Sequence, residues 1–375
     1  MANIYIVKDG DTLYGLSKSF NVPEGKIKRD NQLIGNELLV GQALIIQNKA
    51  IKQRVIVNGY AYPNISEEVL IKTLPNLTYL SVFSYHVTPT GDLISIDDEA
   101  LINSALEQDV KAYLVVTNIG ISGNFDSNLA HVILNSEKVQ NDLISNIVII
   151  MSKKKYFGLD IDFEYIYPVD LVLYNAFLKK VTEILHRNNF PVTTALAPKY
   201  SDTQSGLLYE AHDYYTHGQL SDHVIIMTYE WGYTYGPPMA VAPINQVEKI
   251  LKYAVSVIPS YKIMMGIPNY GYDWVIPYKS GNKASTISNT AAIELAIQKK
   301  SEIKYDAVAQ APFFYYKDNL GSEHIVWFED ARSIQAKLSL VDKYNLSGIS
   351  YWTIMNYFQQ NWIILDLMYE IKKID

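Results

Sequence analysis

Short apolar runs recur along most of the chain, and stretches with apolar residues at helical spacing separate one run from the next. Strands that alternate with helices in this way predict a parallel sheet covered by helices. Eight such runs in roughly 320 residues favour a closed (β/α)8 barrel over an open, doubly wound sheet. The predicted strands cover residues 54–62, 78–86, 111–118, 157–164, 191–198, 223–229, 261–269 and 347–352.

The segments between the predicted strands are amphipathic, as helices on the outside of a barrel should be. No glycine-rich phosphate loop follows any of the strands, which argues against a nucleotide-binding fold. The clearest helical patterns cover residues 97–108, 139–152, 169–189, 243–258 and 331–344.

The interval between the seventh and eighth strands is too long for a single helix. It contains two further strand patterns, 313–316 and 323–328, joined by a polar turn. We therefore predict a small α+β insertion at about 272–345, which forms one wall of a cleft at the carboxyl end of the barrel. The whole barrel domain is predicted to span 54–375.

A separate small unit is predicted at 1–48, before a linker at 49–53. A strand at 5–7 leads into a Gly-Asp-Thr turn, which can cap the helix that follows. Pro23 opens a second helix, and 43–47 forms a closing strand. The order strand, helix, helix, strand in fewer than ~50 residues indicates an independent βααβ module.

Composition narrows the function. The chain has 375 residues, 49% of them apolar, and can bury a substantial core. A formal net charge of −7 argues against a nucleic-acid partner. No cysteine is present, which excludes disulfides, thiolate catalysis and cysteine-ligated zinc. No run reaches ~18 uninterrupted apolar residues, so we expect no membrane insertion.

Residues 1–11 lack the apolar segment of a secretory signal, so we expect no classical signal peptide. The 30 tyrosines fit either AT-rich codon usage or a sugar-binding cleft, because aromatic faces suit the apolar faces of pyranose rings.

Three acids lie on one face of the fourth predicted strand. Asp160, Asp162 and Glu164 alternate with apolar residues, so all three should point into the barrel. Burying three carboxylates costs several kcal/mol unless they share protons or bind something. Crowding raises the pKa of at least one of them, and Glu164, nearest the strand end, can then serve as a general acid near neutral pH. Asp160 lies deeper in the barrel and is better placed to adjust the pKa of Asp162 than to contact a sugar.

A divalent-cation site is the main alternative for these acids, because carboxylates suit Mg²⁺ and Ca²⁺. No complementary acid or histidine cluster stands out elsewhere in the sequence. We therefore expect no metal and no other cofactor.

The acid strand resembles the catalytic motif of glycoside hydrolase family 18, the chitinase family, whose usual form is Asp-x-x-Asp-x-Asp-x-Glu. The last three acids are present, whereas Phe157 replaces the first. We expect the loss of this first acid to shift the pKa values of the remaining acids rather than to abolish activity. Further family landmarks recur in order on strands six, seven and eight, at 227–230, 266–271 and 348–352.

The resemblance implies a substrate-assisted, retaining hydrolase of N-acetylated glycans. Glu164 would protonate the leaving oxygen and later activate water, while the acetamido group of the substrate attacks the anomeric carbon. Asp162 would orient that acetamido group and Tyr229 would bind its oxygen. Trp352 would form the floor under the cleaved sugar. Further candidates for binding substrate are Tyr60, Trp231, Tyr270, Trp274 and Glu230.

The N-terminal unit resembles a lysin motif (LysM), a module that binds N-acetylglucosamine chains. The resemblance implies glycan contacts from two loops, with Gly10, Asp11 and Thr12 in one and Asn31 and Leu33 in the other. Wall affinity from a single copy should be modest, because avidity needs further copies. A packing domain without a ligand is the alternative.

The pairing of LysM with this barrel resembles the spore cortex-lytic glucosaminidases of endospore formers. It implies cleavage of N-acetylglucosamine linkages in cortex peptidoglycan during germination, by a monomer associated with the spore coat, cortex or cell wall. Three alternatives remain open: a chitinase acting on chitin oligomers, a catalytically silent chitinase-like lectin, and a structural coat protein. Retention of both Asp162 and Glu164 argues against the lectin.

Overall fold

The N-terminal unit has the predicted order strand, helix, helix, strand. We describe residues 4–46 and 53–374 of a computed structural model. The two strands pair antiparallel, and Thr12 caps the first helix by accepting a hydrogen bond from the Gly15 amide at 3.0 Å. A small core of Val7, Leu13, Leu16, Ile27 and Leu44 lies between the helices and the strands. The elements are β1 (Ile4–Ile6), α1 (Leu13–Phe20), α2 (Glu24–Asn31) and β2 (Ala43–Ile45).

The predicted linker lies outside the described residues except for its last residue, which begins the first barrel strand. The predicted domain limits at residues 1, 48 and 375 also lie outside them.

Eight parallel strands form the predicted closed barrel, each predicted strand matching one observed strand. Hydrogen bonding follows the order β3-β16-β10-β9-β8-β7-β6-β4, and pairing between β3 and β4 closes the ring. β5 (Leu93–Ile94) and β17 (Tyr369–Ile371) extend β4 and β3. The barrel strands are β3 (Gln53–Ala61), β4 (Tyr79–Val87), β6 (Lys111–Thr117), β7 (Gly158–Asp162), β8 (Val192–Leu196), β9 (His223–Ile226), β10 (Ile263–Pro268) and β16 (Gly348–Trp352).

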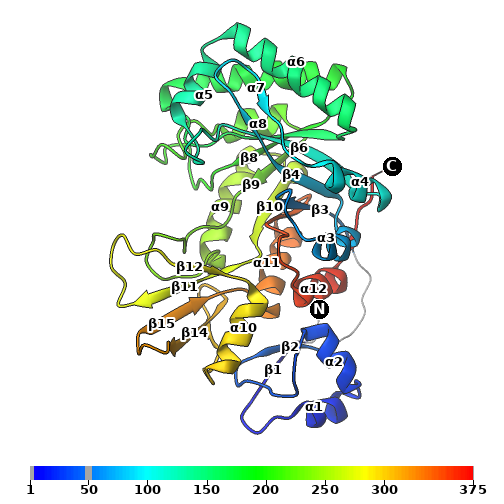
Figure 1. The fold of residues 1–375 in the computed structure, drawn as a ribbon, viewed down its shortest axis with the longest axis vertical. Coiled ribbons are helices and arrows are strands. Elements are labelled where there is room, and N and C mark those ends of the chain that lie inside the picture. The colour runs from blue at the N-terminus through cyan, green and yellow to red at the C-terminus, as the bar shows by residue number, and fades with distance from the viewer. Residues whose placement is uncertain (1–3, 47–52, 375) are drawn as a thin grey trace.

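Helices cover the outside of the barrel, and their apolar faces join the outward-pointing strand residues in one large core (Figure 1). These helices are α3 (Glu67–Thr73), α4 (Glu99–Glu107), α5 (Ser127–Leu134), α6 (Glu137–Lys154), α7 (Leu171–Arg187), α8 (Tyr214–Leu220), α9 (Ile244–Val257), α11 (Ala331–Tyr344) and α12 (Gln359–Met368), with short 3-10 helices η1 (Leu74–Asn76), η2 (Pro168–Asp170) and η3 (Ser260–Lys262).

The insertion between β10 and β16 is an antiparallel sheet with one helix. Its strand order is β12-β11-β15-β14-β13. The predicted end near 345 is too late, because α11 packs against α9 and α12 and so belongs to the outer helices of the barrel. The insertion elements are β11 (Gly271–Ile276), β12 (Ser285–Ile287), α10 (Asn289–Gln298), β13 (Lys304–Asp306), β14 (Ala311–Lys317) and β15 (Glu323–Trp327).

The N-terminal unit is packed against the barrel, beside α12 and α10 (Figure 1). The buried Gln360 amide on α12 donates to Asn31 Oδ1 at 3.0 Å and to the Ala43 carbonyl at 2.9 Å. Gly41 has a φ of +84°, and a Cβ there would lie 1.9 Å from the Ile303 carbonyl oxygen. The two modules therefore share a close polar interface rather than a loose contact.

Candidate active site

The acids of β7 point into the barrel, as the alternation of the strand predicts. Asp160 and Asp162 are buried, and Glu164 lies half-buried just beyond the carboxyl end of the strand. Leu159, Ile161 and Phe163 face the other way and join the core under the helices. The lumen therefore holds a ladder of three carboxyls that rises toward the open end of the barrel.

Asp160 is held by polar side chains from neighbouring strands. Its Oδ2 accepts hydrogen bonds from the Tyr60 hydroxyl at 2.5 Å and from Ser81 Oγ at 3.4 Å. Ser81 also donates to Asn58, which donates to Ser350. Burial raises the pKa of Asp160 to about 6, although the bonds from Tyr60 and Ser81 oppose the shift.

Phe157 replaces an acid with an apolar ring at the bottom of the lumen. The ring stacks on Tyr79 at a centroid distance of 6.1 Å and meets Tyr113 edge-on at 5.8 Å. Both tyrosines belong to the apolar cluster that fills the base of the barrel. Asp160 is therefore the lowest acid on this strand.

Asp162 and Glu164 both favour the protonated form. Burial, followed by the charges of Glu164 and Asp160, raises the pKa of Asp162 well above its ordinary value. Burial, followed by the charge of Glu230, raises the pKa of Glu164 to about 7. We expected crowding within the strand to cause the shift of Glu164, whereas burial and an acid from the segment after β9 are responsible.

One oxygen of Asp162, Oδ1, is buried and accepts no hydrogen bond from any residue within 4–46 and 53–374. A buried acceptor without a partner is unusual, and it marks a place where a ligand donor or a shared proton can bind.

The side chain of Asn118, one residue beyond the end of β6, holds the main chain at Glu164. The ladder of β7 ends at Asp162, two residues earlier. Asn118 Oδ1 accepts from the Glu164 amide at 2.9 Å, and Asn118 Nδ2 donates to the Glu164 carbonyl, also at 2.9 Å. The next residue, Tyr165, has a φ of +53°. Asn118 therefore holds the main chain two residues beyond the ladder and fixes where the Glu164 side chain starts.

His212 holds the preceding residue from the other side. Its Nδ1 accepts from the Ala197 amide at 2.8 Å, so its Nε2 carries the proton and donates to the Phe163 carbonyl at 3.0 Å. Burial lowers the pKa of His212 to about 4, so the ring is neutral near neutral pH. Neither Asn118 nor His212 was predicted as a site residue, because neither belongs to the acid motif.

Glu230 lies in a pocket of tyrosines above the acids. The hydroxyl of Tyr270 donates to Glu230 Oε1, and the hydroxyl of Tyr272 lies 3.1 Å from the same oxygen. Burial raises the pKa of Glu230, while both hydroxyls oppose the shift. Tyr272 was not expected here, although it follows Tyr270 by two residues, the spacing that brings strand residues to one face.

Tyr229 lies next to the same acids. It is nearly buried, and its pKa is raised by burial and then by the charges of Asp162, Glu164 and Glu230. Tyr165, an exposed tyrosine, lies next to Glu164, and the exposed Tyr233 lies near Tyr165; neither was predicted as a site residue. Tyr229, Glu230 and the β7 acids therefore form one group.

Trp352 ends β16 and is half-buried above the lumen. The centroid of its ring lies 4.9 Å from the ring centroid of Phe83 and 5.4 Å from that of Tyr60, and both contacts are edge-on. Tyr62, which is exposed, packs against it at 6.1 Å. Three aromatic rings thus support Trp352, and its role as a sugar-binding floor stays a prediction.

Two of the expected cleft residues have other positions. Trp274 is 2% exposed, and its indole N–H donates to the Gly236 carbonyl at 2.9 Å, so it packs in the core and does not line a cleft. Tyr60 is also buried, and it bonds to Asp160 and lies edge-on to Trp352. Trp231 is half-buried against the main core.

The LysM residues expected to bind glycan are partly engaged within the protein. Asp11 accepts from the Tyr5 hydroxyl and the Lys8 amide, Thr12 caps α1, and Gly10 turns with a φ of +82°. Asn31 is buried between the modules and Leu33 is half-buried. The Asn31 side chain therefore fixes the packing of the modules and is not open to a sugar.

No group of three or more His, Cys, Asp or Glu side chains within the described ranges has the arrangement needed to hold a metal ion. No helix in the same ranges is both long enough and apolar enough to cross a membrane.

A closed eight-stranded barrel with an acid ladder on its fourth strand and an α+β insertion after its seventh defines a glycosidase of the chitinase type. The family model of Glycosyl hydrolases family 18 matches residues 56–356, and that of the LysM domain matches residues 5–47. The chain belongs to glycosyl hydrolase family 18 and carries an N-terminal LysM domain, which confirms both resemblances.

The chain is similar along its length to spore cortex-lytic proteins. It is 40% identical to the cortical fragment-lytic enzyme of Bacillus subtilis (strain 168), with 99% of each chain covered. The crystal structure of the Bacillus megaterium QM B1551 spore cortex-lytic enzyme SleL matches with a TM-score of 0.96 at 37% identity, covering 100% of this chain and 99% of the other. A chitinase from Chromobacterium violaceum matches with a TM-score of 0.77 at 25% identity, covering 84% and 98%.

Proposed function

We propose that this protein hydrolyses N-acetylglucosamine linkages in peptidoglycan, with spore cortex fragments as its substrate and the cell wall or cortex as its place of action. The similarity to cortical fragment-lytic enzymes over nearly the full length of both chains favours this substrate over chitin. The LysM domain supports contact with the glycan.

In the proposed reaction Glu164 is the general acid. Its pKa of about 7 leaves a large protonated fraction near neutral pH, and its half-buried position lets it reach the glycosidic oxygen. The acetamido oxygen of the substrate attacks the anomeric carbon as the leaving oxygen takes the Glu164 proton, and an oxazolinium ion forms. Glu164 then accepts a proton from the water that opens this ion, and the configuration is retained.

Asp162 and Tyr229 are proposed to bind the acetamido group. The unpartnered Oδ1 of Asp162 can accept a hydrogen bond from the acetamido N–H, which also orients the attacking oxygen. The Tyr229 hydroxyl can donate to that oxygen. Asp160, bonded to Tyr60 and Ser81, is proposed to tune Asp162 from below.

A single observation carries this proposal. The half-buried Glu164, its pKa raised to about 7, stands above a buried Asp162 oxygen that lacks a donor. A glycan with an N-acetyl group at the cleaved sugar satisfies both groups at once, whereas a sugar without one leaves Asp162 unsatisfied.

Mass spectrometry of cortex digests tests the proposal. The wild type should generate new reducing-end N-acetylglucosamine from purified cortex fragments, and Glu164→Gln should not. Val308→Glu, an exposed change in the insertion, is the control for folding and handling. Faster cleavage of N-acetylglucosamine oligomers than of cortex fragments would instead indicate a chitinase, and no cleavage of either would refute the hydrolase.

A further inference from the structure

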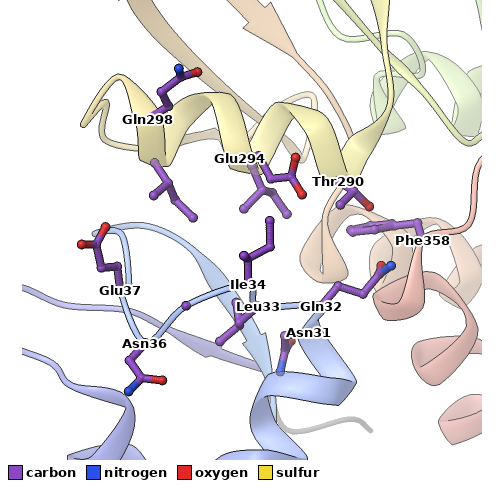
Figure 2. A pocket seen from close by; sticks show the side chains of 13 residues that line it. Asn31, Gln32, Leu33, Ile34, Asn36, Glu37, Thr290, Glu294, Gln298 and Phe358 are labelled. Atoms are coloured by element: carbon purple, nitrogen blue, oxygen red, sulfur yellow. The ribbon is translucent and has the colours of Figure 1, made fainter.

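A groove separates the LysM domain from the insertion, away from the acid ladder. It has a volume of about 460 Å³ and lies between the loop after α2 and helix α10, with Phe358 at one end (Figure 2). This volume is within the range of pockets that bind small ligands. Figure 2 shows Ile34 pointing from the loop toward α10.

Both walls of the groove are fixed before any ligand binds. Gln32 accepts a hydrogen bond from the Gln359 amide at 2.5 Å, next to the bonds that Gln360 makes to Asn31 and Ala43. The other wall, α10, is capped by Ser288 and packed into the core through Ala292 and Ala296. A preformed site avoids the cost of ordering two modules upon binding.

The lining combines apolar walls with a polar rim. Leu33, Ile34, Ile293 and Ile297 supply the apolar surface. The side chains of Gln32, Asn36, Glu294 and Gln298 supply donors and acceptors around it. Such a lining suits a ligand with one apolar face and several hydroxyl or amide groups, as in an N-acetylated pyranose.

One buried hydroxyl in the groove is unsatisfied. Thr290 Oγ1 is buried and has no hydrogen-bond partner in the described part of the chain. A ligand hydroxyl or amide that reached it would satisfy it.

The charge of the lining selects against anionic ligands. Glu37 and Glu294 line the groove, and none of its described lining residues is Lys, Arg or His. Lys28 contacts the rim only by donating to Asn36 at 3.0 Å. A carboxylate in the groove would therefore meet like charge without a counterion.

We propose that this intermodular groove is a second glycan site, which takes neutral N-acetylated sugars and disfavours those that carry a carboxylate. The proposal rests on the proposed function, because it supposes that the glycan held here is also the one cleaved. It differs from the expected LysM site, because its second wall is α10 and the turn at Gly10–Thr12 does not line it.

Binding to the full chain with Glu164→Gln tests the groove. The N-acetylglucosamine tetramer should shift the isoleucine methyl resonances of Ile34, Ile293 and Ile297. Calorimetry should detect binding of the tetramer at the groove. This binding should be lost in Ile297→Glu and retained in Val308→Glu. Thr290→Val keeps the shape of the side chain but removes its hydroxyl. It should weaken the affinity of the groove for the tetramer roughly two- to ten-fold, which corresponds to the loss of one hydrogen bond. Thermal unfolding identifies any variant that fails to fold.

A second arm compares ligand charge. A neutral N-acetylglucosamine tetrasaccharide fragment should bind the groove roughly five-fold more tightly at low salt than a cortex tetrasaccharide fragment with free muramic carboxylates. Unshifted isoleucine methyls, or unchanged binding in Ile297→Glu and Thr290→Val, would refute the groove site. Equal affinity for both fragments would refute the charge selection. Because wild-type cleavage of cortex is measured in parallel, failure of the groove is distinguishable from failure of the hydrolase.

Discussion

Buried carboxylates occur in this barrel in two different settings. On the outside of the strands, Asp98 bonds to Lys154 at 2.5 Å, and Glu329 bonds to Lys337 at 2.8 Å, with both side chains of the second pair 1% exposed. In each case an ammonium group compensates the buried negative charge. These acids join packed elements and do not belong to the group of acids in the lumen.

The lumen acids have no such partner. Within residues 4–46 and 53–374, no Lys, Arg or His forms an ion pair with Asp160, Asp162, Glu164 or Glu230. Their neighbours are tyrosine and serine hydroxyls and one another, and the pKa of every one of them is raised. In the outer acids an ion pair offsets the cost of burying the charge. In the lumen no cation offsets this cost, so the acids hold their protons up to higher pH.

Replacing Asp162 by Asn gives the largest expected effect on activity. The side chain at this position could no longer ionise opposite the positive charge of the oxazolinium ion, so kcat/KM on cortex fragments should fall roughly 100- to 10,000-fold. The pKa of Asp162 is raised in the fold, so its contribution to stability is present at acid pH and is lost as the pH rises. At pH 7 the variant should therefore be as stable as the wild type or more so, as denaturant unfolding would reveal. A parallel loss of stability would contradict this view of the lumen acids.

Lys337→Met should show the opposite behaviour. It leaves Glu329 buried without its cation, so the free energy of unfolding should fall by about 3 kcal/mol, while kcat/KM per folded molecule is retained. The matched control is Lys343→Met, whose partner Glu248 lies at the surface, and its cost should be below ~1 kcal/mol. If Lys337→Met lost activity without losing stability, the two settings would not differ as described.

Periodicity was sufficient to predict the barrel, the insertion and the βααβ unit, because each strand and helix buries one face in a regular pattern. The acid ladder followed from the same argument, since alternation along a strand decides which side chains enter the lumen. Trp274 shows where that reasoning stops: an aromatic near a motif can equally be core, and only its bond to Gly236 reveals which.

Contacts between distant segments were not predictable from local pattern. Asn118 and His212 bond to main-chain atoms just beyond the end of β7, from 46 and 49 positions away in the sequence. Asn31 was expected to face a sugar, yet Gln360, on a helix near the far end of the chain, covers it. Such pairings depend on how modules and strand ends meet, which composition and spacing do not encode.

Asn118→Ala tests how Glu164 is held, with a smaller expected effect. Loss of both main-chain bonds should let the Glu164 backbone shift, so kcat should fall roughly ten-fold with little change in KM. Asn118→Asp keeps the acceptor for the Glu164 amide and should recover part of the rate. Asn289→Ala, another buried asparagine that accepts a main-chain bond, should cost comparable stability without the loss in kcat. Equal kinetic effects at both positions would indicate a purely structural role for Asn118.

Glu230→Gln should produce the smallest and most specific change, a displacement of the pH profile. Glu164 must be protonated to act as an acid, so kcat/KM should decline on the alkaline side as the pH passes its pKa of about 7. The charge of Glu230 is the second cause of that raised pKa, after burial. Its removal should lower the pKa of Glu164 and move the alkaline limb to lower pH, as rates measured from pH 4 to 9 would show. Glu248→Gln, near the surface, should leave the limb in place. A limb that stays fixed in Glu230→Gln would mean that burial alone sets the pKa of the acid, and that the tyrosine-bound carboxyl above it acts only on the substrate.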